Sequence, residues 1–349
     1  MKEAIRKRAE ALGFDSCRFT SAEPPPHKEH FERWLQSGCH GEMGYLQRNA
    51  HKRVEPNKVL SDARTIITLA ASYASDSRTG PIARYARFMD YHHVLGERLK
   101  VLSEFIAGLA VGSCSLWYVD AGPFLERDLA QRAGLGFIGK HTNLISRELG
   151  NWFFLAEIIT TLEIEPDAPE KNRCGTCSRC ITACPTAAIT APYQLDARLC
   201  ISYLTIELKG PIPEPLRPLI GNRIYGCDDC LQICPWNRFA REGRIMKEHA
   251  RPDLDTPDLL ELLALDDAAV KRKFAGTPIM RTKRRGLLRN VCVALGNVGD
   301  LSVLPALEAA TRDNEPLIAD HAEWAIDQIK SREPLTHPQR LTNSSARLP

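Results

Sequence analysis

Hydrophobic and polar residues alternate along the chain with different periods in different regions. Up to about residue 165, amphipathic segments with apolar residues three and four positions apart alternate with short apolar runs rich in β-branched residues. The first kind predicts helices over 2–12, 93–110 and 125–133, and the second predicts strands over 65–73, 115–119 and 152–161. Such alternation indicates an α/β layer, and it leaves the topology open.

The end of the chain has a helical period throughout. Segments 284–295, 301–311 and 316–329 each repeat apolar residues at three- and four-residue steps, and a Gly-Asn-Val-Gly-Asp turn joins the first two. Short paired helices with such a turn resemble a HEAT-type repeat. We therefore predict domains at 1–165, 166–250 and 251–335, with a disordered tail over 336–349 that is rich in Pro, Ser, Thr and Asn.

Composition agrees with an ordinary globular protein. The chain has 349 residues, of which 44% are hydrophobic and 26% charged, enough for two or three domains. No run approaches the length of a membrane-spanning helix, and residues 1–7 form a charged helix start without the apolar core of a secretory signal. We expect a cytoplasmic protein that does not enter a membrane.

Eight cysteines between positions 174 and 234 form two similar motifs. The first reads Cys174-x2-Cys177-x2-Cys180-x3-Cys184-Pro185, and the second, after Cys200, reads Cys227-x2-Cys230-x3-Cys234-Pro235. This spacing is typical of two 4Fe-4S clusters whose motifs exchange the fourth ligand. On that pattern one cluster binds Cys174, Cys177, Cys180 and Cys234, and the other binds Cys184, Cys200, Cys227 and Cys230.

Two other uses of these cysteines are weaker. Cys-x2-Cys pairs also build zinc ribbons. Two Cys-x3-Cys-Pro endings and eight thiols favour iron–sulfur clusters over zinc. A disulfide framework requires an oxidising compartment, for which the N-terminus gives no signal. We interpret the remaining four cysteines as ordinary core or surface thiols: Cys17, Cys39, Cys114 and Cys292.

Three other segments could carry chemistry. Asp120 directly follows a predicted strand and precedes a Gly-Pro turn into a helix, where open α/β sheets place their ligands, although a helix cap would look the same. Three glycines in six residues at 134–139 would let the backbone pass a large flat cofactor, or form a tight connection. The segment 90–96 is one residue off an Asp-x-His-x-x-Gly cobalt motif, but His92 and His93 could equally be surface residues at a helix start.

The formal net charge of +3 is too small to indicate a binding partner. The basic residues, however, are distributed unevenly along the chain. From Lys271 to Gly299 there are eight basic residues and no acidic one. Taken alone, such a run is more often a solvated basic face than a binding site. Four-residue spacing would place Arg281, Arg285 and Arg289 on one helix face.

Taken together, these segments resemble the epoxyqueuosine reductases, cobalamin-dependent iron–sulfur enzymes that complete queuosine synthesis in tRNA. The resemblance rests on Asp120-x-Gly-Pro-x-Leu-Glu-Arg, on Gly-Leu-Gly-Phe-Ile-Gly-Lys-His-Thr-Asn-Leu from position 134, on both cysteine motifs, and on Ile-Tyr-Gly-Cys-Asp-Asp-Cys from position 224. With the helical end, it covers nearly all of the chain.

The resemblance implies a fold, a reaction and cofactors. An α/β cobalamin-binding domain, a ferredoxin-like module with two 4Fe-4S clusters and an all-α HEAT-like domain would reduce epoxyqueuosine to queuosine at the wobble position, 34. The cobalamin would be base-off, and the clusters would reduce its cobalt to a low-valent state that engages the epoxide carbon. Asp120 matches the proton donor of the family, which an alkoxide leaving group requires. His141, Asn143, Leu144 and Ser202 are the predicted cobalamin contacts.

The same resemblance names the partners. Because the substrate base lies in an anticodon stem-loop, the basic segment would hold RNA phosphates while an everted nucleoside enters the pocket. The predicted contacts are Arg281, Lys283, Arg284, Arg285 and Arg289. An external donor such as a ferredoxin or flavodoxin would supply electrons, and we expect a monomer.

Two alternatives remain open from the sequence. A reductive dehalogenase also pairs cobalamin with two clusters, but those enzymes carry a twin-arginine signal and lack a helical repeat. An electron carrier or cobalamin-handling protein would use the helical end for docking. Mobility shift of an anticodon stem-loop separates both from a tRNA enzyme.

Overall fold

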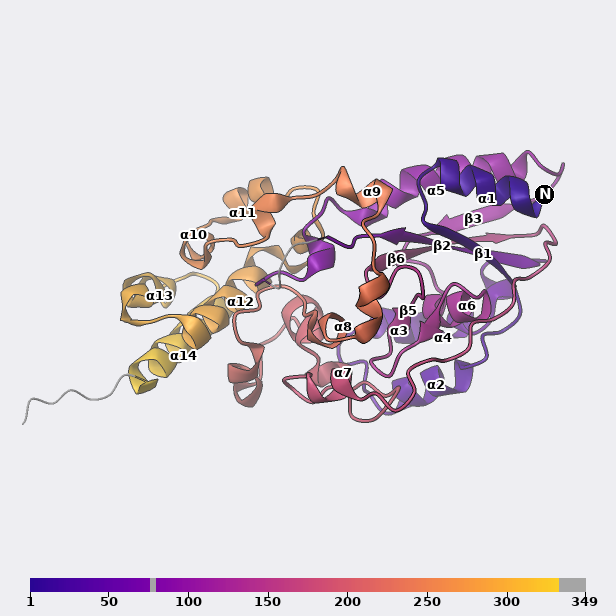
Figure 1. Cartoon of the computed structure of the whole chain (residues 1–349). Helices are drawn as coiled ribbons and strands as arrows, with labels where there is room; N and C mark the ends of the chain where they lie inside the picture. The colour runs from indigo at the N-terminus through magenta and orange to yellow at the C-terminus, as the bar shows by residue number, and fades with distance from the viewer. Residues whose placement is uncertain (76–79, 333–349) are drawn as a thin grey trace, which may run out of the picture.

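The computed structural model describes residues 1–75 and 80–332. In Figure 1 a sheet with its helices lies at one end, the helices of the last region lie at the other, and the cysteine-rich loops lie between them. The predicted disordered tail falls outside the described residues. None of the described helices combines the length and apolar character that a membrane span needs.

One four-stranded sheet forms the α/β region. Its order is β1 (Ser16–Ser21), β2 (Thr65–Ser72), β6 (Phe153–Thr160) and β3 (Ser115–Tyr118), and all three pairings are antiparallel. Three of these strands match the predicted runs, whereas β1 was not predicted. Because no strand pair is parallel, the rule that ligands bind at the carboxyl ends of parallel strands does not explain the position of Asp120.

Helices cover both faces of the sheet, with α1 and α5 on one side and α6 on the other (Figure 1). The helices α1 (Lys2–Ala11) and α5 (Tyr91–Ala107) bury Ile5, Leu95 and Leu99 against one face. On the opposite face, α6 (Glu126–Arg132) packs Leu129 against Ile66 and Ile159. The predicted helices agree with these bounds to within three residues, because their apolar period reflects the face that they bury.

Shorter elements complete this region. Three helices follow β1: α2 (Lys28–Gln36), α3 (Gly44–Arg48) and α4 (Ala50–Arg53). After α6, β4 (Phe137–Ile138) and β5 (Leu144–Ile145) pair as a small hairpin. The cysteine-rich region has two one-turn helices that pack together, α7 (Arg179–Thr182) and α8 (Asp229–Gln232).

The last region is helical, as predicted. Its helices are α10 (Leu259–Leu263), α11 (Asp267–Lys273), α12 (Lys283–Val298), α13 (Leu304–Ala310) and α14 (Pro316–Arg332). The preceding helix α9 (Arg244–Lys247) packs instead against β2 and α5 of the α/β region. Residues 287–296 of α12 are all buried, so α12 is the central helix. A Cβ at Gly296 would stand 2.8 Å from Ala325 Cα, so glycine permits the close packing of α12 on α14. The helical region is as expected; its HEAT-type pairing stays a prediction.

The three predicted regions share cores. Ile82 and Ala86, from the α/β region, are buried with Leu287 and other residues of the helical end. Isolated bridges join Ile82 to Tyr225 and Phe88 to Ala250. Residues 81–90 therefore connect all three regions.

Candidate active site and cluster loops

Asp120 stands on a turn just after β3. Its φ is +54°, an uncommon conformation for a residue with a side chain. The side chain is 53% exposed, and its Oδ2 accepts a 2.5 Å hydrogen bond from Tyr91 Oη. His92 Nε2 lies 3.8 Å from the same oxygen. Asp120 is thus oriented by the start of α5 and remains open to solvent.

Tyr91 belongs to an aromatic wall behind Asp120. It stacks on Phe154 with ring centroids 4.2 Å apart and meets Tyr85 edge-on at 6.3 Å, and Tyr85 lies 6.1 Å from Tyr225. Burial, followed by the negative charge of Asp120, raises the pKa of Tyr91 well above its usual value. The phenol therefore stays protonated and keeps donating to Asp120.

Arg281, from the helical end of the chain, lies near enough to Asp120 for that charge to act on its pKa. It forms a 2.7 Å ion pair with Glu207 and lies over the ring of Tyr45 at 5.9 Å. Burial lowers the pKa of Arg281, but Glu207, Tyr45, Tyr225 and Asp120 outweigh it, so the pKa is raised. One wall of the site thus comes from the helical end of the chain.

Sequence reasoning did not place Tyr91, His92 or the pair Glu126 and Glu157 at this site. Tyr91 and His92 lie in the segment that was considered as a cobalt motif or a helix start, yet both approach Asp120. Glu126 and Glu157 form a buried carboxyl pair close enough for the charge of Asp120 to raise both pKa values. A glutamate inside the apolar run 152–161 was the signal that could have revealed Glu157.

The glycine-rich segment folds back on itself. A Cβ at Gly136 would stand 2.4 Å from Ile145 O, so that glycine serves the tight β4–β5 connection. Leu144 is 4% exposed and packs with Ala130 and Leu135. The prediction that Leu144 contacts a cofactor therefore disagrees with its place in the core.

The other predicted cofactor contacts differ in exposure. His141 is 3% exposed; burial and then the charge of Arg127 lower its pKa to about 4, which keeps the ring neutral. Asn143 is half-buried, and its Oδ1 accepts a 3.2 Å hydrogen bond from Arg127. Ser202 is also half-buried and lies two residues after Cys200. Of the four, Asn143 and Ser202 retain exposed surface.

Cysteines of the two motifs lie near one another in the structure. After burial, the neighbours that raise the pKa of Cys174 and Cys180 include Cys234 in both cases. For Cys230 they are Cys227, Cys200, Cys184 and Cys180. Because Cys180 belongs to the other predicted set, the exchanged ligand pattern stays a prediction.

The basic segment does not form one exposed face. Arg281 precedes α12, in a 3-10 turn over Pro278–Thr282, and Lys283 is exposed at the helix start. Arg284 is mostly buried in an ion pair with Asp313. Arg289 is 1% exposed. The expectation that Arg289 reaches RNA is therefore wrong for this structure, because its side chain points into the protein.

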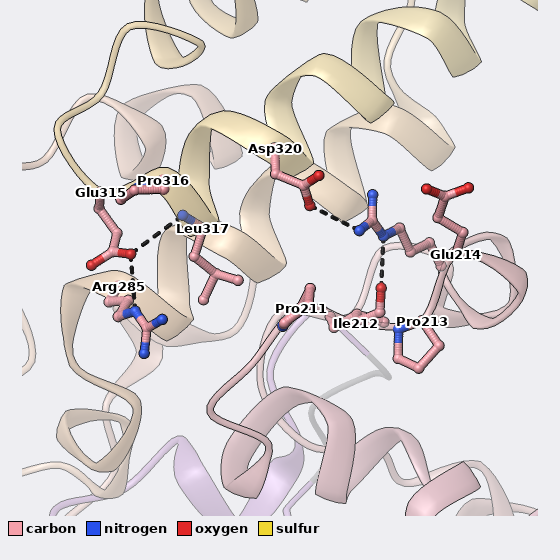
Figure 2. A pocket seen from close by; sticks show the side chains of 10 residues that line it. Pro211, Ile212, Pro213, Glu214, Arg285, Glu315, Pro316, Leu317 and Asp320 are labelled. Atoms are coloured by element: carbon pink, nitrogen blue, oxygen red, sulfur yellow. Dashed lines mark hydrogen bonds and ion pairs between the residues drawn. The ribbon is translucent and has the colours of Figure 1, made fainter.

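Arg285 borders a pocket of about 680 Å³ between α14 and the loop 211–217. Figure 2 shows Arg285 and Glu315 on one side of this pocket and Asp320 on the other. Arg285 pairs with Glu315 at 3.0 Å, and Asp320 pairs with Arg217 at 2.9 Å. The two arginines of this pocket, Arg285 and Arg217, are thus already paired with carboxylates. The pocket lies apart from Asp120 and adds no chemistry to that site.

Two family models match separate parts of the chain. Residues 173–237 match the 4Fe-4S double cluster binding domain, and residues 53–121 match epoxyqueuosine reductase QueG. The first match contradicts the zinc reading of the cysteines. The second includes Asp120 and the start of α5.

Full-length relatives agree. The chain is 43% identical to the epoxyqueuosine reductase of Xanthomonas campestris pv. campestris over 336 residues, which cover 93% of this chain and 95% of the relative. It is 40% identical to the Escherichia coli epoxyqueuosine reductase, with 94% and 89% covered.

Solved structures give the same result. The Streptococcus thermophilus epoxyqueuosine reductase superimposes with a TM-score of 0.86 at 32% identity, covering 96% of this chain and 92% of that one. An epoxyqueuosine reductase with an epoxyqueuosine-modified tRNA-Tyr stem loop gives a TM-score of 0.87 at 33% identity, covering 94% and 90%. The protein therefore belongs to the epoxyqueuosine reductase family.

Proposed function

We propose that this protein reduces epoxyqueuosine to queuosine at the wobble position of tRNA, with Asp120 as the proton donor. The reductase reaction follows from membership in the family, at 43% identity over 93% of the chain. The relative solved with an epoxyqueuosine-modified tRNA stem loop supports tRNA as the substrate. The observation that carries the role of Asp120 is its exposed carboxyl group, held by Tyr91 beside the aromatic wall.

The reaction requires such an acid. Removing the oxygen of an epoxide consumes two electrons and two protons, and the leaving alkoxide is poor unless it is protonated. The turn that carries Asp120 could deliver this proton, because its carboxyl group is half-exposed. A Bacillus subtilis epoxyqueuosine reductase has been solved with a catalytic aspartate loop swung out of the active site, which supports a mobile acid.

Electrons would pass through two clusters in series. We assign the first to Cys174, Cys177, Cys180 and Cys234, and the second to Cys184, Cys200, Cys227 and Cys230. Residues 175, 176, 178 and 179 are exposed around the first set, so an external donor could reach it. Tyr225, two residues before Cys227, joins the second set to Tyr85 and the aromatic wall. The second cluster would therefore lie nearer Asp120.

A cobalamin between the second cluster and Asp120 fits part of the predicted residue set. Asn143 has a half-buried amide that could meet a corrin amide, and Arg127 beside it is exposed. Leu144 is buried in the core, whereas the buried His141 Nε2 has no hydrogen-bond partner among the described residues and could meet a polar group of the cofactor. When bound, this cofactor would supply a low-valent metal that takes the cluster electrons and acts on the epoxide carbon. The residues of the chain would orient the substrate and supply protons.

For the RNA we propose contacts from the exposed cations Arg281, Lys283 and Arg285. Arg281 connects this surface to the site, because it also lies over Tyr45. Arg284 and Arg289 are excluded by their burial.

Nucleoside mass spectrometry of tRNA from a deletion strain tests the function. Loss of the gene should leave epoxyqueuosine at position 34, and wild-type protein should restore queuosine. The Asp120→Asn variant should bind iron and fail to restore it. Accumulation of any other nucleoside would contradict the proposed substrate.

A further inference from the structure

Two glutamates meet between α6 and the sheet, near the turn that carries Asp120. Glu126 is the first residue of α6, and Glu157 lies in the middle of β6. Glu157 is 0% exposed and stands opposite Thr68 on β2 and Tyr118 on β3. The two carboxyl groups lie close enough for each to act on the pKa of the other.

Apolar side chains surround Glu157 on its face of the sheet. Two residues further along β6, Ile159 packs with Leu129. Two residues back, Leu155 packs against the cluster that contains Ala130. Side chains two apart on a strand share a face, so Glu157 lies between two apolar clusters. An ionised carboxylate without partners there would lose its hydration and gain nothing in return.

Hydrogen-bond donors do not compensate this burial. Among the described residues, no N–H or hydroxyl group donates to Glu126 Oε1 or to either oxygen of Glu157. Arg127 and Arg53 act on Glu126 through their charge. Both direct Nη1 to backbone carbonyl oxygens instead, at 2.7 to 3.2 Å. When two neighbouring carboxyl groups receive no hydrogen bond from an N–H or hydroxyl group, one proton shared between them satisfies their oxygens.

Burial and the charge of Asp120 raise the pKa values of both glutamates. Burial and then the charge of Asp120 raise the pKa of Glu126, against the opposing effects of Glu157, Arg127 and Arg53. Burial and then Glu126 raise the pKa of Glu157 well above its usual value, and Asp120 adds to this. The pair therefore keeps a proton at neutral pH.

The reaction needs more protons than Asp120 can hold. Cleaving the first C–O bond of the epoxide with one proton leaves a hydroxyl group, and cleaving the second with another proton releases water and leaves the alkene. The two electrons come from the clusters. One carboxylic acid carries one proton, so Asp120 must be reprotonated between the two cleavages.

We propose that the Glu126–Glu157 pair stores the second proton and passes it to Asp120. This rests on the proposed function. The proton leaves a carboxyl oxygen of the pair for Asp120, its bonding electrons remain on the glutamate, and solvent later restores it. Asp120 lies six residues before Glu126, and the charge of Asp120 acts on both glutamates. Glu126 and Glu157 are proton-storage residues that need not touch the substrate.

The test uses Glu157→Gln and Glu126→Gln in reconstituted full-length enzyme with a modified stem-loop. Glu163→Gln is the control, because Glu163 is exposed just beyond the same strand. Single-turnover rates of queuosine formation are measured across pH. In either pair variant we expect a loss of about tenfold at about pH 8, with the alkaline fall in rate moved to lower pH, because general-acid supply is worth about 100-fold or more. Small buffer acids should restore the rate of the variants alone.

A second measurement needs no variant. The infrared spectrum of the wild-type protein at neutral pH should contain the C=O band of a buried protonated carboxyl group, sensitive to exchange into D2O. Its absence would overturn proton storage, even if the variants fail to fold. Wild-type pH profiles in both glutamine variants, or rates that buffer acids do not restore, would also overturn it. If wild-type enzyme itself forms no queuosine, the proposed function has failed instead, and the infrared band still reports on the pair.

Discussion

Replacing Arg289 by methionine should destabilise the protein strongly without weakening its contacts to RNA. Arg289 Nη1 donates to Leu208 O at 2.8 Å and to Gly210 O at 2.7 Å, and Nη2 donates to Leu204 O at 2.6 Å. These bonds hold the segment that follows Cys200 against the central helix α12. Burial lowers the pKa of Arg289 to about 10, so the group is still charged at neutral pH.

The magnitude follows from what the substitution leaves behind. Methionine fills much of the space but leaves one buried and two part-buried carbonyl groups without their donor, each at a cost of about 1 to 3 kcal/mol. Partial relaxation and entry of water reduce the sum, so we expect a loss of about 3 to 5 kcal/mol. That is a large part of the roughly 5 to 15 kcal/mol that stabilises a typical protein.

Arg285→Met is the matched control, since it removes the same charge from the same helix. Arg285 is about half-exposed and has one ion pair, with Glu315 at 3.0 Å. Its loss should cost about 0 to 1 kcal/mol. Denaturant unfolding followed by circular dichroism, with iron content measured in parallel, gives both values.

RNA binding should show the opposite order. Arg285→Met should make the dependence of log affinity on log salt shallower by roughly 0.7 to 0.9, the value of one phosphate contact. Folded Arg289→Met should keep the wild-type slope. An equal change of slope in both variants, or a stability loss below about 1 kcal/mol for Arg289→Met, would refute this account of Arg289.

Four further results are expected. Reconstituted protein should bind close to eight irons per chain, and Cys234→Ala should damage the cluster of the first motif; a spectroscopic loss confined to the other cluster would reverse the assignment. Asp120→Asn should keep the clusters and lower turnover about a hundredfold; wild-type turnover would reduce Asp120 to a turn residue. Lys283→Glu combined with Arg285→Glu should weaken stem-loop binding and flatten its salt dependence, and an unchanged slope would place the RNA elsewhere. Burial, followed by the charge of Arg217, lowers the pKa of His321 to about 4. The free energy of unfolding should therefore fall by about 3 kcal/mol as the pH drops from 6.5 to about 4. If the His321→Gln variant lost the same stability over this pH range, the assignment to His321 would be wrong.

The sequence predicted those parts of the fold that local patterns encode. Helices α1 and α14 and strands β2 and β6 bury one face or both, so their periods are visible. The order of the strands and their antiparallel pairing depend on contacts between distant segments. Strand β1 is short and mixes polar with apolar residues, so no run marks it.

The candidate site shows the same division. Cysteine spacing predicted the cluster region, because three ligands of each set lie within one short stretch. The contact between Glu126 and Glu157 joins a helix start to a distant strand and has no local signature. The burial of Arg289 could have been inferred, since Cys292, Val293 and Gly296 share its helix face and are apolar. The run of neighbouring cations obscured that pattern.

The segment 81–90 has a consequence for synthesis of the chain on the ribosome. Ile82 and Ala86 complete a core whose other members lie mainly between Leu254 and Ile329. At elongation rates of about 5 to 20 residues per second, roughly 10 to 50 s separate the emergence of the two parts. During that interval Ile82 and Ala86 lack the helices against which they pack in the folded protein. A ribosome that stalls before α12 would release a chain that is prone to aggregate.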